Sequence, residues 1–366
     1  MPEFLSTELQ QLRESSAALA RDSLLALRDN ARLDAGTRAQ QVRAASKAAG
    51  IYHLTQDEHT TELALLVVRE TLASHGVGHL DGVFGADAGV LERIEEPLRS
   101  SHLLPLLAGE KRAGFAFTEP ADAARSTWAR VDGEELVVNG QKSYVTGGAD
   151  ASFLTTMLEI EGEGPSLVII DTDRPGVTVS RRFSSLDGSD HAAFRFDEVR
   201  VPRHYALGAP GDGRARAMDK ISGVRRRVAA ECMGTTLWII ELVANDLRKP
   251  RRGGSKGEFE RVRLRFGEMR ISAYAARSLV YRTARLADAG ENVVNETIAA
   301  KVFVSEVANQ VVDAAIQIVG GEALVAGHPL EAAYRRLRGW RLAEGESDTL
   351  RVNLSRGFLD LGKGRL

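Results

Sequence analysis

Hydrophobic positions along the chain follow three successive patterns. In residues 6–45, Leu and Ala recur at helical spacing with charged residues on the opposite face, which predicts amphipathic helices. Residues 60–75 form a further apolar-faced helix that ends at Gly76, and residues 86–110 continue the pattern. The N-terminal part of the chain is therefore expected to be mostly helical.

The middle of the chain has the residue pattern of β-strands. Between about residues 113 and 212, short segments rich in Val, Phe, Thr and Ile are separated by Gly, Pro and Asp, which is typical of β-strands. Asn139-Gly140 predicts a two-residue hairpin turn, because both central positions of a type I′ turn need a positive φ. From Ala215 apolar residues again recur at helical spacing, in three or four long segments with short links. This pattern predicts an antiparallel helix bundle.

Together these patterns predict an α+β fold with an N-terminal helical domain (1–112), a central antiparallel β domain (113–212) and a C-terminal antiparallel four-helix bundle (213–366). A chain of 366 residues with 43% hydrophobic content is long enough for two or three packed domains. The formal net charge of -2 supplies no overall field for nucleic acid or a membrane. The N-terminus has neither the pattern of a secretory signal nor that of a membrane span. We expect a cytoplasmic protein with no nucleic-acid or membrane partner.

Three isolated features have an ordinary structural explanation. Cys232, the single cysteine, lies in an apolar run, so a buried structural thiol is favoured over a nucleophile. His75 and His79 have ligand spacing, but glycines intervene and no carboxylate completes the set, so no metal site is expected. The link RKPRRGGSKGE (248–258) groups basic residues with glycines and is either a phosphate-facing loop or, as we favour, a solvated helix-end loop.

Five longer motifs follow one another in a fixed order. They are FAFTEP (115–120), VDGEELVVNGQKSYVTGGADAS (131–152), FRFDEVRVP (194–202), ANQVVDAAIQIVGGEAL (308–324) and YRRLRGWRLAEGESDTLRVNLSR (334–356). In sequence and order they resemble motifs of the acyl-CoA dehydrogenases, over roughly residues 45–360. Five ordered motifs are far more specific than any one alone.

The resemblance implies α,β-dehydrogenation of an acyl thioester carried by CoA or by an acyl carrier protein. A carboxylate removes the α proton while the β hydrogen leaves as hydride to N5 of a bound FAD. Hydrogen bonds to the thioester oxygen, from the backbone N–H of the base and a ribityl hydroxyl of FAD, stabilise the developing charge. The protein positions and polarises the substrate, and the flavin accepts the electrons.

The base position of the family's E-G signature falls on Glu344. Burial beside an apolar acyl chain is expected to raise the pKa of this carboxyl by desolvation rather than through a charge partner. The alternative is an ordinary carboxylate at a helix N-terminus, favoured there by the helix dipole. Gly345 follows it, and Arg225 matches a bundle arginine near the base and the substrate, with a solvated basic face as an equal competitor.

Other motif positions match contacts to FAD. Phe117 and Thr118 match residues whose backbone and hydroxyl touch the flavin ring, and Tyr144 and Thr146 match residues at its reactive edge. The alternative for these four is ordinary strand packing. A second set, from the segment that holds the ADP part of FAD in a neighbouring subunit, comprises Gln317, Gly320 and Gly321. This second set implies a homodimer or a homotetramer.

Several cofactor contacts depart from the family pattern. The glycine-rich pyrophosphate loop after the TEP motif is missing, and Ser126 is the available substitute. The arginine and phenylalanine of the family's R-x-x-F-G motif are replaced, and Lys249 or Arg252 is left to neutralise phosphate. Glu346 adds a negative charge near the expected cofactor, and Arg336 is placed to answer it.

Three functions are consistent with these residues. The first is an FAD-dependent dehydrogenase of acyl thioesters, which the motifs favour. The second is a flavin enzyme of this fold with redirected chemistry, such as a monooxygenase. The third is a protein of this fold without FAD, acting as a binding or assembly subunit or as a redox-neutral enzyme; the altered pyrophosphate contacts favour that reading.

Overall fold

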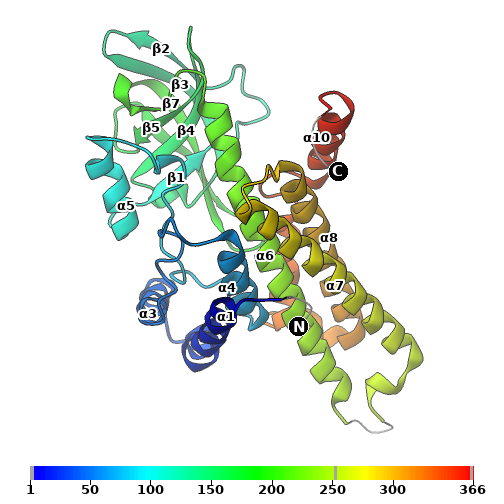
Figure 1. Cartoon of the computed structure of the whole chain (residues 1–366). Helices are drawn as coiled ribbons and strands as arrows, with labels where there is room; N and C mark the ends of the chain where they lie inside the picture. Colours follow the sequence, from blue (N-terminus) through cyan, green and yellow to red (C-terminus); the bar gives the residue numbers. More distant parts are fainter. Residues whose placement is uncertain (1–3, 251–253, 363–365) are drawn as a thin grey trace. The chain divides into compact units, whose positions relative to one another are not determined.

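A computed structural model describes residues 4–250, 254–362 and 366 (Figure 1). The chain divides into two compact units, one formed by residues 1–85 with 222–366 and the other by residues 86–221. The first unit is helical and the second carries the β-strands, which confirms the α+β class. The three-domain boundaries expected from the sequence stay a prediction.

The N-terminal part of the helical unit contains short, capped helices. They are α1 (Thr7–Leu19), which continues through the π-helical turn η1 (Ala20–Leu24) into α2 (Leu25–Asp29), then α3 (Ala35–Ala48) and α4 (Glu62–Ser74). Side chains of Ser6, Asp34 and Thr61 accept hydrogen bonds from backbone N–H groups of the first turns of α1, α3 and α4. Apolar faces of these helices form a common core with the loop that follows α4.

The C-terminal part of the same unit is a bundle of long helices, the first of which begins in the second unit. They are α6 (Gly213–Arg248), α7 (Glu260–Asp288), α8 (Val294–Val319), α9 (Pro329–Trp340) and α10 (Ser347–Leu359), with 3-10 turns η6 (Lys256–Glu258) and η7 (Gly321–Leu324). In Figure 1, α7 and α8 run side by side. Helices α6 and α8 are long and apolar enough to be membrane-span candidates, but they supply much of the bundle core. Cys232 is fully buried in this core, as predicted.

The second unit begins with less helix than the sequence predicts. Residues 86–110 form only the 3-10 turn η2 (Gly89–Leu91), the π-helical turn η3 (Arg99–Leu103) and the one-turn helix α5 (Leu104–Ala108). Gly89 adopts a positive φ of 51°, and Pro97 lacks the N–H that a helix interior requires. The apolar residues of this stretch nevertheless pack together in a core with strand residues.

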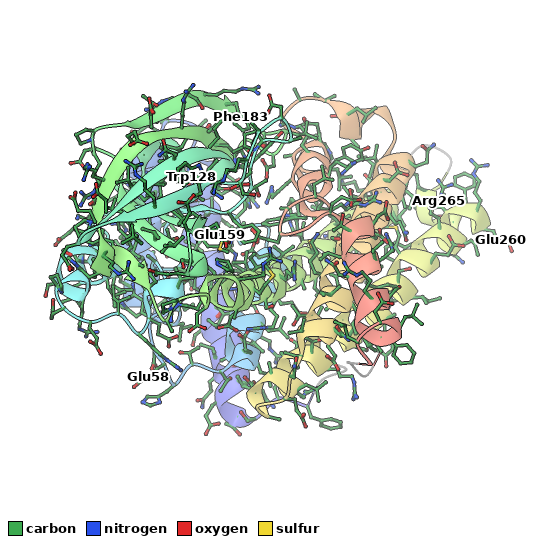
Figure 2. The ribbon with its side chains drawn as sticks, turned by 90° about the horizontal axis from the view of Figure 1, so that it is seen from above. Glu58, Trp128, Glu159, Phe183, Glu260 and Arg265 are labelled. Carbon is green, nitrogen blue, oxygen red and sulfur yellow. The ribbon has the colours of Figure 1, made fainter. Side chains whose placement is uncertain are left out.

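The strands form one eight-stranded sheet in the order β6-β7-β3-β2-β4-β5-β8, with β1 paired to β4 off this path. They are β1 (Ala113–Ala116), β2 (Trp128–Asp132), β3 (Glu135–Thr146), β4 (Phe153–Ile160), β5 (Gly164–Asp171), β6 (Val177–Ser184), β7 (Asp190–Pro202) and β8 (Ala206–Leu207). An antiparallel sheet was predicted, but the sheet is mixed. Strands β1 and β2 both pair with β4 in parallel. Trp128 and Phe183 mark β2 and β6 in Figure 2.

The predicted hairpin at Asn139-Gly140 is wrong. Both residues lie inside the single strand β3, and the turn from β2 to β3 is at Gly133. The register of β3 against β7 shifts between Val138 and Gly140, so Asn139 faces two residues of β7, Asp197 and Glu198, and the β-bulge lies on β7. Glycine is required there because a Cβ would lie 2.6 Å from the Cα of Thr127.

Candidate active site

Glu344 lies in a tight turn between two helices of the bundle. Helix α9 ends at Trp340 and α10 begins at Ser347, and residues 341–346 between them form what we call the Glu344 turn. Glu344 has a φ of 57°, a left-handed conformation that is uncommon for a residue with a side chain. Such backbone strain persists only where the surroundings hold it, and it often occurs at functional positions.

Local contacts explain the shape of the turn. The backbone N–H groups of Leu342 and Ala343 donate to the Gly339 carbonyl, and that of Ser347 donates to the Arg341 carbonyl. Gly345 also has a positive φ, of 105°. A Cβ there would lie 3.0 Å from Leu350 Cδ2 and 3.2 Å from Arg225 Nη2, so glycine suits this position on both counts.

Two buried cations bind consecutive carbonyl groups of this turn. Arg225 on α6 donates from Nε to the Glu344 carbonyl at 2.8 Å. Lys301 on α8 donates from Nζ to the Gly345 carbonyl at 2.6 Å, with the Arg341 carbonyl at 3.5 Å. Both side chains are buried, and that of Lys301 is fully so. The structure thus brings together Glu344, Gly345 and Arg225, as the sequence suggested, and adds a lysine.

The electrostatics of the turn follow from this burial. Burial lowers the pKa of Lys301 to about 8, and the Arg225 charge acts in the same direction, while Cys232, Glu344 and Glu346 oppose the shift. Burial also lowers the pKa of Arg225, opposed by the charge of Glu344. Glu344 therefore has cationic neighbours, whereas the sequence argument considered desolvation alone.

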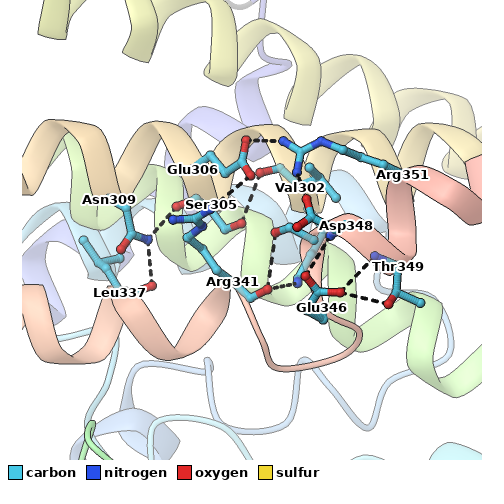
Figure 3. A network of polar contacts seen from close by, with 12 residues as sticks. Val302, Ser305, Glu306, Asn309, Leu337, Arg341, Glu346, Asp348, Thr349 and Arg351 are labelled. Carbon is cyan, nitrogen blue, oxygen red and sulfur yellow. Dashed lines mark hydrogen bonds and ion pairs between the residues drawn. The ribbon is translucent and has the colours of Figure 1, made fainter.

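Glu346 occupies the helix end that the sequence offered as an alternative role for Glu344. Its carboxylate is the N-cap of α10 and accepts hydrogen bonds from the backbone N–H groups of Asp348 and Thr349 (Figure 3). These hydrogen bonds lower the pKa of the Glu346 carboxyl. The charge of Glu346 thus stabilises the start of α10, and Glu344 lies two residues before that cap.

The surrounding ion pairs tie α8 to the Glu344 turn and to α10. Glu306 on α8 accepts a hydrogen bond from Arg351 at 2.5 Å and pairs with Arg341 at 3.5 Å (Figure 3). An apolar cluster of Ile298, Val302 and Leu350 lies in the same helix contact. The Glu344 turn and α10 are therefore anchored to α8.

In the sheet unit, Phe117 and Thr118 directly follow β1 and are bound to β3. The buried Lys142 Nζ donates to the Phe117 carbonyl at 3.2 Å and to Glu119 Oε1 at 2.8 Å. The backbone N–H of Ser143 donates to the Thr118 carbonyl at 2.8 Å. The TEP segment is thus fixed against β3 through its backbone.

Tyr144 is presented by a second β-bulge. Between Lys142 and Val145, two residues of β3 oppose one residue of β7, and Tyr144 takes a φ of 54°. Its side chain is 63% exposed and makes an edge contact with Phe183, with ring centroids 5.2 Å apart. Thr146 Oγ1 lies 3.3 Å from His191 Nδ1. An exposed aromatic ring beside a hydroxyl is a surface suited to a planar polar ring.

Ser126 lies in the irregular segment between β1 and β2 and is exposed. The preceding Arg125 stacks over Trp128 and pairs with Glu161 at 3.1 Å. No glycine occurs between residues 121 and 127. Backbone N–H groups alone cannot cradle a pyrophosphate here as a glycine-rich loop would, so Ser126 stays a predicted contact.

The other predicted cofactor residues lie at the far end of α8. Gln317 is exposed near the C-terminus of α8, and Gly320 follows with a φ of 91° and a ψ of −164°. Lys256 Nζ donates to the carbonyls of Ile318 and Val319, at 3.2 and 2.7 Å. A Cβ at Gly320 or at Gly321 would meet no atom within 4 Å, so the backbone there is open to a bound group.

Lys249 is linked to the same end of α8 through Asp246. The Asp246 carboxylate lies 3.6 Å from Lys249 Nζ through one oxygen and 3.6 Å from Lys256 Nζ through the other. Arg252 lies outside the described residues. Part of the basic link is therefore structural, because Lys256 caps the carbonyl end of α8.

The residues present fit two separate parts of FAD. Tyr144 and Thr146 offer an exposed aromatic and a hydroxyl for a ring system, and the open backbone at Gly320-Gly321 can approach a phosphate or ribose. The glycine-rich loop that would contact the pyrophosphate is missing. Residues suited to the two ends of such a cofactor are thus present in the chain.

A small pocket also lies within the helical unit, outside the Glu344 turn. It is lined by Ala73, Gly76, Gly78, His79, Glu231, Thr235, Trp238, Arg336 and Trp340. Burial lowers the pKa of His79 to about 3, and the charges of Arg336 and Arg28 act in the same direction. His79 is therefore neutral at physiological pH. Arg336, which the sequence suggested as an answer to the Glu346 charge, lies beside this histidine.

Comparisons with known proteins agree with the motifs. Residues 108–199 match the model of the acyl-CoA dehydrogenase middle domain, and residues 211–359 match that of the C-terminal domain. The acryloyl-CoA reductase (NADH) of Anaerotignum propionicum is 31% identical over 271 residues, which are 70% of this chain and 69% of the relative. The chain belongs to the acyl-CoA dehydrogenase family.

Two further similarities are to proteins named acyl-CoA dehydrogenases. The human mitochondrial short-chain specific acyl-CoA dehydrogenase is 29% identical over 265 residues, covering 69% of this chain and 64% of the relative, so the match spans less than two thirds of that protein. The solved acyl-CoA dehydrogenase of Bacillus anthracis complexed with FAD superposes with a TM-score of 0.84 at 23% identity, covering 99% of this chain and 68% of that chain. This likeness confirms the predicted fold.

Sequence reasoning missed Lys301. A signal was available, because Lys301 is a charged residue in the otherwise apolar run TIAAKVFV. Lysine is almost never fully buried unless its charge is satisfied. A lysine on the apolar face of a bundle helix therefore predicts a specific partner, although not that the partner is a backbone carbonyl.

Proposed function

We propose that this protein oxidises the Cα–Cβ bond of an acyl thioester, with Glu344 as the general base and FAD as the cofactor. The observation that carries the proposal is the left-handed Glu344, whose carbonyl and that of the next residue are bound by Arg225 and Lys301. A base must hold its carboxylate at a defined position relative to the α carbon. Membership of the acyl-CoA dehydrogenase family supports the same role.

The residues of the chain then have distinct tasks. The Glu344 carboxylate takes the α proton, and the cations behind its backbone keep the turn in one conformation. Arg225 and Lys301 also attract the carboxylate electrostatically. FAD, when bound, supplies N5 as the acceptor of the hydride from the β carbon, so that the acyl group loses a proton and a hydride and becomes the enoyl thioester.

FAD contacts are assigned to both units of the chain. Phe117, Thr118, Tyr144 and Thr146 would hold the flavin ring, with Ser126 near the pyrophosphate. The ADP end would lie on Gln317, Gly320 and Gly321, with Lys249 or Arg252 neutralising phosphate. In the family pattern this second set serves a neighbouring subunit, so the proposal includes a homodimer or a homotetramer. The thioester carrier is CoA or an acyl carrier protein.

The direction of the reaction deserves a separate test, because one relative is named an acryloyl-CoA reductase (NADH). The same groups serve both directions, with Glu344 returning a proton to the α carbon when an enoyl thioester is reduced. Reduction of an enoyl thioester is therefore the second candidate function.

An anaerobic flavin titration tests the proposal. The protein, reconstituted with FAD, is mixed with saturated acyl-CoA thioesters of four to sixteen carbons while the absorbance of the oxidised flavin near 450 nm is followed. We expect bleaching and formation of the enoyl thioester, detected by mass spectrometry. The dithionite-reduced protein is mixed with the enoyl thioester to test the reverse reaction.

The outcomes separate the functions that the sequence left open. Protein that binds FAD but is not bleached by any acyl thioester, and that consumes oxygen when its flavin is reduced in the presence of a second substrate, would favour a monooxygenase. Failure to bind FAD under all conditions would contradict the proposal and favour the FAD-free subunit. Re-oxidation only by an enoyl thioester would assign the reductive direction.

A further inference from the structure

Lys301 is a buried cation whose two described hydrogen bonds go to the backbone. Its ammonium donates to the carbonyls of Gly345 and Arg341, the residues on either side of the Leu342–Glu344 segment. Arg225 binds the carbonyl between them in sequence, that of Glu344. Cations from α6 and α8 thus reach three of the carbonyls in the Glu344 turn.

Stability of the fold does not account for an ammonium at this position. Burial disfavours the charged form of Lys301, which is why its pKa lies near 8 rather than at its ordinary value. An apolar side chain of similar length would fill the same space without that penalty, as replacements of buried charges in other proteins have shown. The lysine is therefore better explained by what it binds than by the core it fills.

What it binds is a strained backbone. Glu344 and Gly345 have successive positive φ values of 57° and 105°. This conformation turns their carbonyl groups toward α6 and α8, where Arg225 and Lys301 donate hydrogen bonds to them. A hydrogen bond from a charged donor is roughly twice as strong as one from a neutral donor. Two such bonds on adjacent residues oppose relaxation of the turn.

We propose that Lys301 is a positioning residue which, together with Arg225, holds the Glu344 turn in its left-handed conformation and so aims the Glu344 carboxylate. This inference rests on the proposed role of Glu344 as the base. Lys301 does not touch the reacting atoms; it acts through the backbone of the residue that does.

The arrangement makes the turn sensitive to alkaline pH. Lys301 faces Arg225 and Cys232 from α6, and Glu344 and Glu346 from the Glu344 turn. As its ammonium loses a proton near pH 8, the charged hydrogen bond to Gly345 becomes a neutral one and the turn is held less firmly. An alkaline decline in turnover is expected to follow the titration of this lysine.

The experiment compares Lys301→Met, Lys301→Arg and the wild type, with Arg277→Met as a matched control. Arg277 is also a buried cation of the helical unit, but its contacts are to Glu70 and Tyr281. Two measurements are made on the FAD-reconstituted protein. Hydrogen–deuterium exchange follows residues 341–347 at pH 7 and pH 9, and kcat and KM for acyl thioester oxidation are measured from pH 6 to pH 10.

We expect Lys301→Met to exchange faster in residues 341–347 than the wild type does. Its kcat is expected to fall roughly 100-fold with little change in KM, because the base is displaced while the binding surface remains. The alkaline decline should disappear from both lysine variants, because methionine does not titrate and arginine stays charged. Lys301→Arg should recover part of kcat, and Arg277→Met should keep the wild-type pH profile.

Each outcome bears on the inference. Wild-type exchange in residues 341–347 of Lys301→Met, or an alkaline decline that persists in both lysine variants, would overturn it. If the wild type oxidises no thioester, the exchange measurement still decides whether Lys301 holds the turn, so failure of the proposed function is distinguishable. If Lys301→Met does not fold, Lys301→Arg and the wild-type exchange at the two pH values decide the question.

Discussion

Among the described residues of the helical unit, cations are buried in two places, and their charges are compensated in different ways. In the first, Arg277 on α7 meets Glu70 on α4 in a paired geometry, with Nη2 to Oε1 at 2.6 Å and Nε to Oε2 at 2.9 Å. Tyr281 adds a hydrogen bond to the same carboxylate at 3.0 Å. In the second, Arg225 and Lys301 donate to backbone carbonyls of the Glu344 turn.

The pKa values reflect this difference. Burial acts to lower the pKa of Arg277, but the hydrogen bonds and charge of Glu70 outweigh it, so that the pKa of Arg277 is raised. At the Glu344 turn burial prevails, and the pKa values of Arg225 and Lys301 are both lowered. A carboxylate partner stabilises the first cation, whereas carbonyl dipoles compensate the other two only in part.

The comparison separates a buried charge that links helices from buried charges that arrange a functional group. The Glu70–Arg277 pair joins α4 to α7 and is supported by Tyr281. The cations at the Glu344 turn donate to the backbone carbonyls of Glu344 and Gly345, so they act on the conformation of the turn. We therefore expect the buried cations of the functional site to be only partly stabilised by their hydrogen-bond partners.

Glu344→Gln is expected to have the largest effect on this comparison. The substitution keeps the shape of the side chain and removes its basicity, so kcat should fall about 1,000-fold. Reconstitution with FAD and the free energy of unfolding should change little, by about 1 kcal/mol at most. Stopped-flow reduction of the flavin and urea unfolding measure the two quantities. A variant that retains wild-type kcat would show that the Glu344 turn does not carry the base.

Arg277→Met breaks the other buried site and should act on stability instead. Removing one partner leaves the Glu70 carboxylate buried without its cation, which costs about 4 kcal/mol of unfolding free energy. Replacing both residues, with Glu70→Leu and Arg277→Met, should restore part of that loss. Urea unfolding of the single and double variants tests this. Equal destabilisation in both would mean that the pair itself stabilises the fold.

Much of the architecture could be predicted because local patterns and packing agree. Helical periodicity located α4 and the long bundle helices, and β-branched residues located the strands. The hairpin predicted at Asn139-Gly140 is wrong because Gly140 serves a close approach of backbone inside β3, opposite a bulge in β7, and not a turn. Sequence alone does not show that Gly140 lies against Thr127, the residue before β2.

The candidate site was predictable as a set of residue types and not as an arrangement. The E-G signature gave Glu344 and Gly345, but the helix cap assigned as an alternative to Glu344 belongs to Glu346. Lys301 was overlooked because its partner is a backbone carbonyl 44 residues away, which no side-chain motif records. Contacts to backbone groups are the part of a site that residue spacing describes least well.

The lowered pKa of Lys301, unlike the raised pKa of Arg277, should make the free energy of unfolding depend on pH. A group whose pKa is lower in the folded state stabilises the fold above its unfolded pKa of about 10.5, and this contribution is lost as the pH falls through about 8. The wild type should therefore gain about 2 kcal/mol relative to Lys301→Met between pH 7 and pH 9.5. Urea unfolding of both proteins at the two pH values gives this difference. An unchanged difference would mean that Lys301 titrates as in the unfolded chain.

The smallest expected effect comes from Glu346, the carboxylate two residues from the base. Glu346→Gln keeps an acceptor for the N–H groups of Asp348 and Thr349, so α10 should stay capped. Its lost charge no longer supports the ammonium of Lys301, whose pKa should fall by roughly 0.3 unit. The midpoint of the alkaline decline in kcat should move to lower pH by the same amount.

Asp348→Asn is the matched control for that shift. It removes another carboxylate from the same helix end, but Asp348 is not among the charges with the largest effects on the pKa of Lys301. Its side chain is exposed and pairs with Arg351. The midpoint should therefore stay where it is in the wild type. If both variants moved it equally, the decline would report the net charge of this surface, and the specific link between Lys301 and the Glu344 turn would fail.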